Sequence, residues 1–177
     1  MSLQHAGILA GVVAGGAATI GGLFSGWLTD RLVVRDRQWL LGVPILGQGI
    51  SLLCMLLYLF WPSHIAFEMF GIPVPTALLW CTLAGFFTVW WVAPLLNLLT
   101  QMVSPWERAT AVALQTICTT VAGVGLGPLF IGMVSDALQD ISGNESLRYA
   151  LVLSTLAVVV GLLLLLRLYR QGLLKSR

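Results

Sequence analysis

Residues 26–37 read GWLTDRLVVRDR, where a long apolar run ends near Gly26 and is followed by Asp30, Arg31 and further cations. A related stretch, GMVSDAL at residues 132–138, closes another apolar run much later in the chain. Both fit one pattern: Gly, any residue, an aliphatic residue, Ser or Thr, Asp, any residue, Leu. If the helices between them alternate across a membrane, the two copies lie on opposite faces. Such a pair indicates an inverted internal repeat, an architecture common in membrane transport proteins.

The composition indicates whether the chain is a soluble protein or a membrane protein. Hydrophobic residues make up 58% and charged residues only 9% of the 177 residues, with a mean hydropathy of +0.94. Because soluble domains carry about 25% charged residues, we expect an integral membrane protein. The net charge of +2 is too small to indicate nucleic-acid binding.

Five apolar runs are long enough to cross a bilayer, which takes about 20 helical residues. The sequence therefore predicts an all-α membrane protein with about five transmembrane helices. The fourth run is too long for one straight crossing, and we expect a kink at Gly127 and Pro128, with a second bend at Pro94. The predicted spans are residues 6–29, 39–61, 75–101, 107–138 and 147–169.

The distribution of cations predicts the orientation. With five alternating spans, Arg148 alone falls on one side, and that side is expected to be external. The N-terminus is then outside and the C-terminus cytoplasmic. The eight cations on the cytoplasmic side are Arg31, Arg35, Arg37, Arg108, Arg167, Arg170, Lys175 and Arg177.

Small residues form a stripe along the first span and predict close approach of another helix. Successive members are three or four positions apart, so they share one helical face. The stripe consists of Gly11, Gly15, Ala18, Gly22 and Gly26.

Two groups of polar residues lie within the apolar runs. In the third span, the spacing of Trp90, Asn97 and Gln101 places them with Pro94 on one helical face, and Gln115 and Thr119 share a face of the fourth. An unpaired amide in hydrocarbon costs several kcal/mol, so these faces are expected to point at a water-filled cavity or at protein. Hydrogen bonding between helices is an equally good interpretation.

Other chemistries find no support in the sequence. No Asp, Glu, Lys, Arg or His lies well inside a span, so no proton-coupling site is evident. Enzyme motifs such as HExxH, CxxC or a glycine-rich phosphate loop are absent. Each of the three cysteines lies in a separate apolar run, which argues against a disulfide or a metal site. We expect no catalytic residues, no metal and no cofactor.

The motif at Gly26–Arg31 resembles the G-x-L-x-D-R loop of the major facilitator superfamily. The match departs after Arg31, where the family pattern often continues with Gly and a basic pair, and this chain has two valines and Arg35. The rest of the chain is similar to the spinster-type branch, so the resemblance covers essentially all 177 residues. The similar stretches are Ala93-Pro94, Pro105 with Arg108-Ala109, GLGPLFIGMVSD at residues 125–136 and ESLRY at residues 145–149.

The resemblance implies an incomplete C-terminal half of a twelve-helix fold. The chain would correspond to helices eight to twelve, and its partner would be an N-terminal half from the same gene or a separate chain. Helices eight, ten and eleven would face the substrate cavity, which favours cavity-lining roles for Trp90, Asn97, Gln101, Gln115 and Thr119.

By the same resemblance, Gly26, Asp30, Arg31 and Arg35 would form a cytoplasmic gating motif that pairs with the partner half. The simpler interpretation is that these charges only stop the helix at the membrane surface.

The function implied is secondary active transport of a small or amphiphilic, lipid-like organic solute by alternating access, in the inner (plasma) membrane of a bacterium. On this view the chain would not transport without the N-terminal half. The alternative is a free-standing five-helix membrane protein that serves as an interaction or assembly partner without transport.

Overall fold

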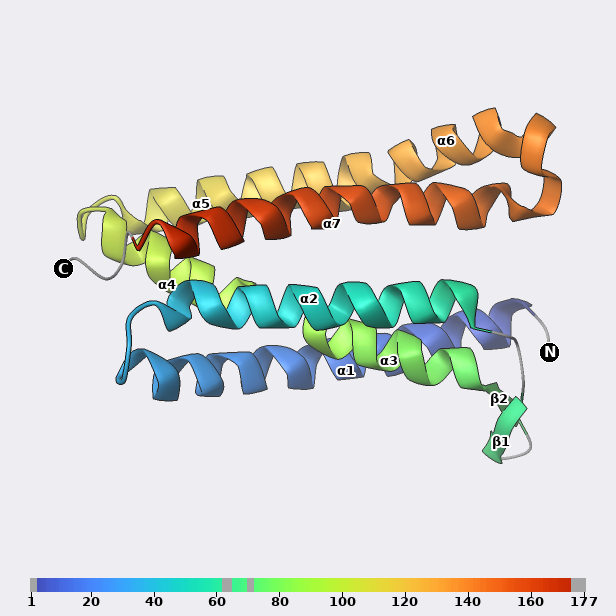
Figure 1. Cartoon of the computed structure of the whole chain (residues 1–177), viewed down its shortest axis with the longest axis horizontal. Coiled ribbons are helices and arrows are strands. Elements are labelled where there is room, and N and C mark those ends of the chain that lie inside the picture. Colours follow the sequence, from blue (N-terminus) through green and yellow to red (C-terminus); the bar gives the residue numbers. More distant parts are fainter. Residues whose placement is uncertain (1–2, 62–64, 70–71, 173–177) are drawn as a thin grey trace. The chain divides into compact units, whose positions relative to one another are not determined.

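The computed structural model describes residues 3–61, 65–69 and 72–172. As expected, the described chain is built from helices (Figure 1). In chain order they are α1 (Leu3–Val33), α2 (Trp39–Phe60), α3 (Thr76–Thr88), α4 (Val92–Met102), α5 (Arg108–Thr119), the π-helix η1 (Thr120–Leu126), α6 (Gly127–Ser142), the 3-10 turn η2 (Gly143–Glu145) and α7 (Ser146–Arg170).

A short β-hairpin lies in the loop between α2 and α3, outside the predicted spans except for Pro75. Strand β1 (Ile65–Met69) pairs with β2 (Ile72–Pro75) in antiparallel order, with Met69 opposite Ile72. The β-branched and aromatic residues of this loop favour an extended backbone. Prolines are tolerated because both strands of a two-stranded ribbon are edge strands.

Four helical segments of the described chain are long and apolar enough to cross a membrane. They overlap the second to fifth predicted spans, and their ends differ by a few residues. The first predicted span lies within α1, several of whose side chains fall outside the described residues, and its crossing stays a prediction. The four segments are Trp39–Phe60, Thr76–Met102, Arg108–Gln139 and Ser146–Arg170.

The chain divides into two compact units. One comprises Met1–Leu95 together with Leu162–Arg177, and the other is Leu96–Gly161. Within the first unit, α1, α2 and α3 pack together, and the buried core includes Leu40, Val43 and Cys54 on α2. α1 and α2 both approach α3 closely, at Gly21 and Gly47.

In the second unit, α5, η1 and α6 continue one another without a loop, as the yellow and orange ribbon in Figure 1 shows. The wide π turns end directly before Gly127 and Pro128, where the sequence predicts a kink. Because Pro128 has no amide hydrogen, the carbonyl four residues earlier has no ordinary helical donor. The irregular backbone thus occupies the seven residues of η1 rather than a point at the proline.

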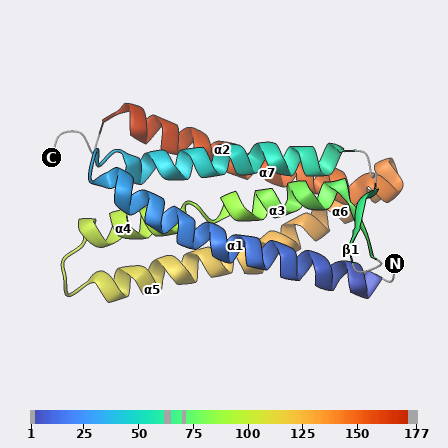
Figure 2. The ribbon, with the colours of Figure 1, turned by 90° about the horizontal axis from the view of Figure 1, so that it is seen from below.

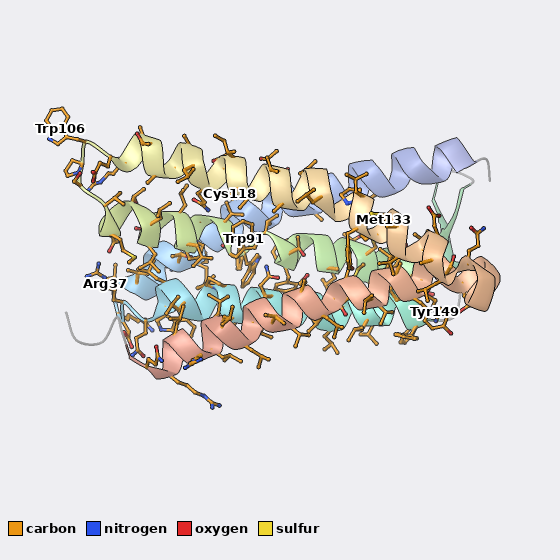
Figure 3. The ribbon with its side chains drawn as sticks, turned by 90° about the horizontal axis from the view of Figure 1, so that it is seen from above. Arg37, Trp91, Trp106, Cys118, Met133 and Tyr149 are labelled. Carbon is orange, nitrogen blue, oxygen red and sulfur yellow. The ribbon has the colours of Figure 1, made fainter. Side chains whose placement is uncertain are left out.

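The ends of these helices carry their own signals. Gly143 ends α6 with a φ of 52°, a conformation that favours glycine. The Ser135 and Ser146 hydroxyl oxygens lie 3.2 Å apart where α6 and α7 meet. In the turn between α4 and α5, Trp106 is 94% exposed and projects away from the ribbon (Figure 3).

Candidate functional site

The third predicted span is not one continuous helix. α3 ends at Thr88 and α4 begins at Val92, and the turn Val89–Trp91 between them is called the α3–α4 break below (Figure 2). Pro94 explains its position, because proline lacks an amide hydrogen and its ring crowds the carbonyl four residues earlier, that of Trp90. Inside the break, the Trp90 and Val92 amides donate only three residues back, to Phe87 at 3.2 Å and Val89 at 3.1 Å.

Side chains from two other helices cap the break. The Ser25 hydroxyl of α1 donates to the Trp90 carbonyl oxygen at 3.0 Å. The Gln48 amide of α2 donates to the Thr88 carbonyl oxygen at 2.9 Å. Non-helical backbone within a membrane is tolerated only where its polar groups find such partners, so these caps explain how the span can be broken.

Ser51 supports the last turn of α3. Its hydroxyl donates to the Ala84 carbonyl oxygen at 3.2 Å and lies 2.8 Å from the Thr88 hydroxyl oxygen. Ser51 is 4% exposed and Ser25 is fully buried. Ser25, Gln48 and Ser51 were not among the site residues predicted from the sequence. In the sequence they resemble any other polar residue in an apolar run. Only their hydrogen bonds to α3 and to the break distinguish them.

Trp90 lies in the break itself, so helical spacing does not connect it with Asn97 and Gln101. The predicted stripe of the third span is therefore interrupted. Trp90 is 6% exposed, and its ring lies 4.8 to 5.8 Å from those of Phe24, Phe86 and Phe87, between centroids. Its indole Nε1 is buried and has no hydrogen-bond partner within the described part of the chain. Figure 3 labels the next residue, Trp91, where the ribbon passes from α3 to α4.

Asn97 and Gln101 lie together on α4. The Gln101 amide donates to the Asn97 side-chain oxygen at 2.6 Å, and Asn97 is partly exposed whereas Gln101 is exposed. Pro94, at the start of the same helix, is buried. This pair satisfies part of its hydrogen-bonding capacity within one helix, which is neither the cavity-facing arrangement nor the bonding between helices considered from the sequence, and the lining role stays a prediction.

The two predicted lining residues of α5 differ from each other. The Thr119 hydroxyl donates within its own helix, at 3.0 Å from the carbonyl oxygens of both Gln115 and Thr116. The side-chain oxygen Oε1 of Gln115 is buried without a partner among the residues described. Gln115 and Trp90 thus each carry a buried polar atom that finds no hydrogen-bond partner among the described residues.

The predicted gating motif lies at the end of α1. Asp30, Arg31 and Arg35 are exposed and border one shallow depression of about 540 Å³. The Arg31 guanidinium stacks over the Trp27 ring, 4.6 Å from its centroid, a favourable cation–π contact. Gly26, one turn earlier, is partly buried. A Cβ added at this position would lie 3.9 Å from the Cβ of Ala93.

Asp30 stands in an unfavourable position. It lies in the last turn of α1, where the partial negative charge of the helix end disfavours a carboxylate. Among the described residues, no ion pair of Asp30 offsets this unfavourable position.

No group of three or more potential metal ligands gathers in the part of the chain that the structure describes. The site consists instead of a capped helix break, a buried aromatic cluster and an exposed charged helix end.

Comparison with known proteins finds relatives among membrane transporters. The chain is 32% identical over 158 residues to an MFS-type efflux pump of Mycolicibacterium smegmatis, covering 89% of this chain and 34% of that protein. The chain is homologous to transporters of the major facilitator superfamily. It is also 36% identical over 90 residues to the sphingosine-1-phosphate transporter SPNS2 of Xenopus tropicalis, covering 46% of this chain and 17% of that protein.

These superfamily relatives are transporters, not enzymes, in agreement with the sequence analysis. The chain spans about a third of the length of the efflux pump and less than a fifth of the spinster-type transporter. No protein-family model and no solved structure matches it.

Proposed function

We propose that this chain contributes to a secondary active transporter that moves an amphiphilic organic solute across the membrane by alternating access. The observation that carries the proposal is the similarity to a superfamily efflux pump over 89% of the chain. The spinster-type relative transports, by its name, a phosphorylated lipid-like molecule, which favours an amphiphilic solute for this chain as well.

Two polar atoms support a solute-binding role for predicted lining residues. Trp90 Nε1 is a donor and Gln115 Oε1 an acceptor, and both are buried without a partner among the described residues. Because buried polar groups in proteins are almost always hydrogen-bonded, a bound solute or ordered water would complete each of them. Asn97, Gln101 and Thr119 complete the proposed lining, although their side chains already make hydrogen bonds within their own helices.

The gating role of Gly26, Asp30, Arg31 and Arg35 is part of the same proposal. The partner is an N-terminal half of the transporter, supplied by the same gene or by a separate chain. In the closed cytoplasmic state, Asp30 would pair with a cation or a helix N-terminus of that half. We further propose the cytoplasmic membrane of a bacterium as the location, with the N-terminus outside and the C-terminus inside.

Reconstitution tests this proposal. The chain is placed in proteoliposomes alone and together with a separate chain that supplies the first seven helices of a superfamily transporter, and flux of a fluorescent amphiphile is followed. We expect flux only with both chains, and a raised half-saturation concentration in Gln115→Leu. If the two chains form a stable complex that carries no member of a panel of amphiphiles, the five-helix interaction protein becomes the better explanation.

A further inference from the structure

At the α3–α4 break, the backbone carbonyl oxygens of Thr88 and Trp90 differ in one respect. A straight helix would provide a hydrogen-bond donor for one of them but not for the other. In a continuous helix, the Thr88 carbonyl would accept the Val92 amide, four residues later. The Trp90 carbonyl would face Pro94, which has no hydrogen to donate. Straightening the span therefore satisfies Thr88 but never Trp90.

The two caps consequently have different roles. We propose that Gln48 is a positioning residue that holds the third span in its broken form and is released when the span straightens, whereas Ser25 caps the Trp90 carbonyl in both forms. Gln48 competes with the Val92 amide for one acceptor, the Thr88 carbonyl. No backbone amide competes with Ser25 for the Trp90 carbonyl, because the residue that would donate to it in a helix is Pro94, which has no amide hydrogen.

The surroundings of the break fit a joint with one movable contact. The Gln48 cap comes from α2 beside Gly47, where an added Cβ would overlap that of Trp90 and lie 3.2 Å from the Phe87 carbonyl oxygen. This close approach keeps the Gln48 side chain within reach of the break. The Val92 amide now donates to the Val89 carbonyl oxygen at 3.1 Å, and in a continuous helix it would donate to that of Thr88 instead.

The boundary between the two compact units supports the same interpretation. It falls between Leu95 and Leu96, one turn beyond the break. Asn97 and Gln101 lie beyond this boundary on the same helix, α4. That these residues move with α4 during transport rests on the proposed function, whereas the competition at Thr88 does not.

Distances between spin labels measure the state of the joint in the full chain. The three native cysteines are replaced by alanine, and labels are attached to Leu79→Cys and Met102→Cys, whose native side chains are 52% and 76% exposed. A continuous helix would place these backbone positions about 35 Å apart. In lipid nanodiscs we expect most of the wild-type distribution to lie away from this value.

Variants then separate the two caps. Gln48→Met keeps the side-chain length but removes the donor, and we expect it to raise the fraction near the straight-helix distance about threefold, the effect of one average hydrogen bond between membrane helices. Ser25→Ala leaves Trp90 uncapped in both forms, so it lowers the thermal midpoint without raising that fraction. The matched control Gln115→Met, which removes another amide from an apolar span, leaves the distribution unchanged.

Three results would overturn the inference: a Gln48→Met distribution equal to that of the wild type, a wild type already at the straight-helix distance, or an equal shift in Ser25→Ala. None of these measurements requires transport. If the distances respond to Gln48→Met but the reconstituted chains carry no solute, the joint stands and the proposed function falls. If transport occurs and the distances do not respond, the reverse holds.

Discussion

The contact between α1 and α3 depends on a glycine whose neighbour in the sequence provides an internal control. A Cβ at Gly21 would overlap the Phe86 carbonyl oxygen and lie 2.8 Å from the carbonyl carbon, both of them backbone atoms. A Cβ at Gly22 would meet only the Val89 side chain, at 4.0 Å, which is ordinary van der Waals contact. Alanine should therefore be excluded at the first position and accepted at the second.

The magnitude follows from two opposing terms. A methyl group forced against atoms that cannot rotate away costs about 1–3 kcal/mol. Replacing glycine by alanine inside a helix contributes up to about 1 kcal/mol in the other direction. Because both positions lie inside α1, the helix term cancels in their comparison, and Gly21→Ala should be less stable than Gly22→Ala by about 1–3 kcal/mol.

The assay is equilibrium unfolding of the purified chain in mixed micelles, with the free energy of unfolding compared between the variants. A second pair repeats the test on α2. A Cβ at Gly47 would overlap that of Trp90 and lie 3.0 Å from Trp90 Cγ, whereas Gly49 has nothing within 4 Å. If Gly21→Ala and Gly47→Ala are as stable as their controls, the packing of α1 and α2 on α3 is refuted.

Three further predictions use other parts of the chain. Asp30→Asn should lower transport in the two-chain proteoliposomes by up to about fivefold, the effect of an exposed ion pair of about 1 kcal/mol, without lowering the free energy of unfolding, because Asp30 is exposed; normal flux would exclude the gating role. Gly143→Ala should lower the free energy of unfolding by about 1–2 kcal/mol, because its φ of 52° is strained for other residues, and an unchanged value would contradict this. Glu145→Gln removes the partly exposed 3.2 Å ion pair with Arg148 and should change the free energy of unfolding by less than about 1 kcal/mol; a larger loss would show that this pair matters more than its exposure suggests.

Hydropathy was sufficient to predict helices and a membrane protein, because long apolar runs determine both. Finer features depended on contacts between helices. The small-residue stripe pointed to Gly22 and Gly26, whereas the closest approach occurs at Gly21, since the rotation of α1 against α3 is set by packing at all positions together. Likewise, Pro94 predicted a bend, but its consequence for Trp90 depended on which side chain could reach the freed carbonyl. Ser25 was available in α1 and could not be singled out before the two helices were placed side by side.

The magnitudes also limit what each proposed contact could do in a transport cycle. Moving a two-state equilibrium from 1:99 to 99:1 takes about 5.5 kcal/mol. An exposed ion pair of Asp30 would supply at most about 1 kcal/mol, and the Gln48 hydrogen bond between helices about 0.6 to 1.7 kcal/mol. Together they fall short by half or more, so neither contact could lock one state by itself. The remaining free energy would have to come from the solute or from the interface with the partner half. The Asp30 and Gln48 contacts would therefore only bias the equilibrium between the two states, and solute binding would shift it most of the way.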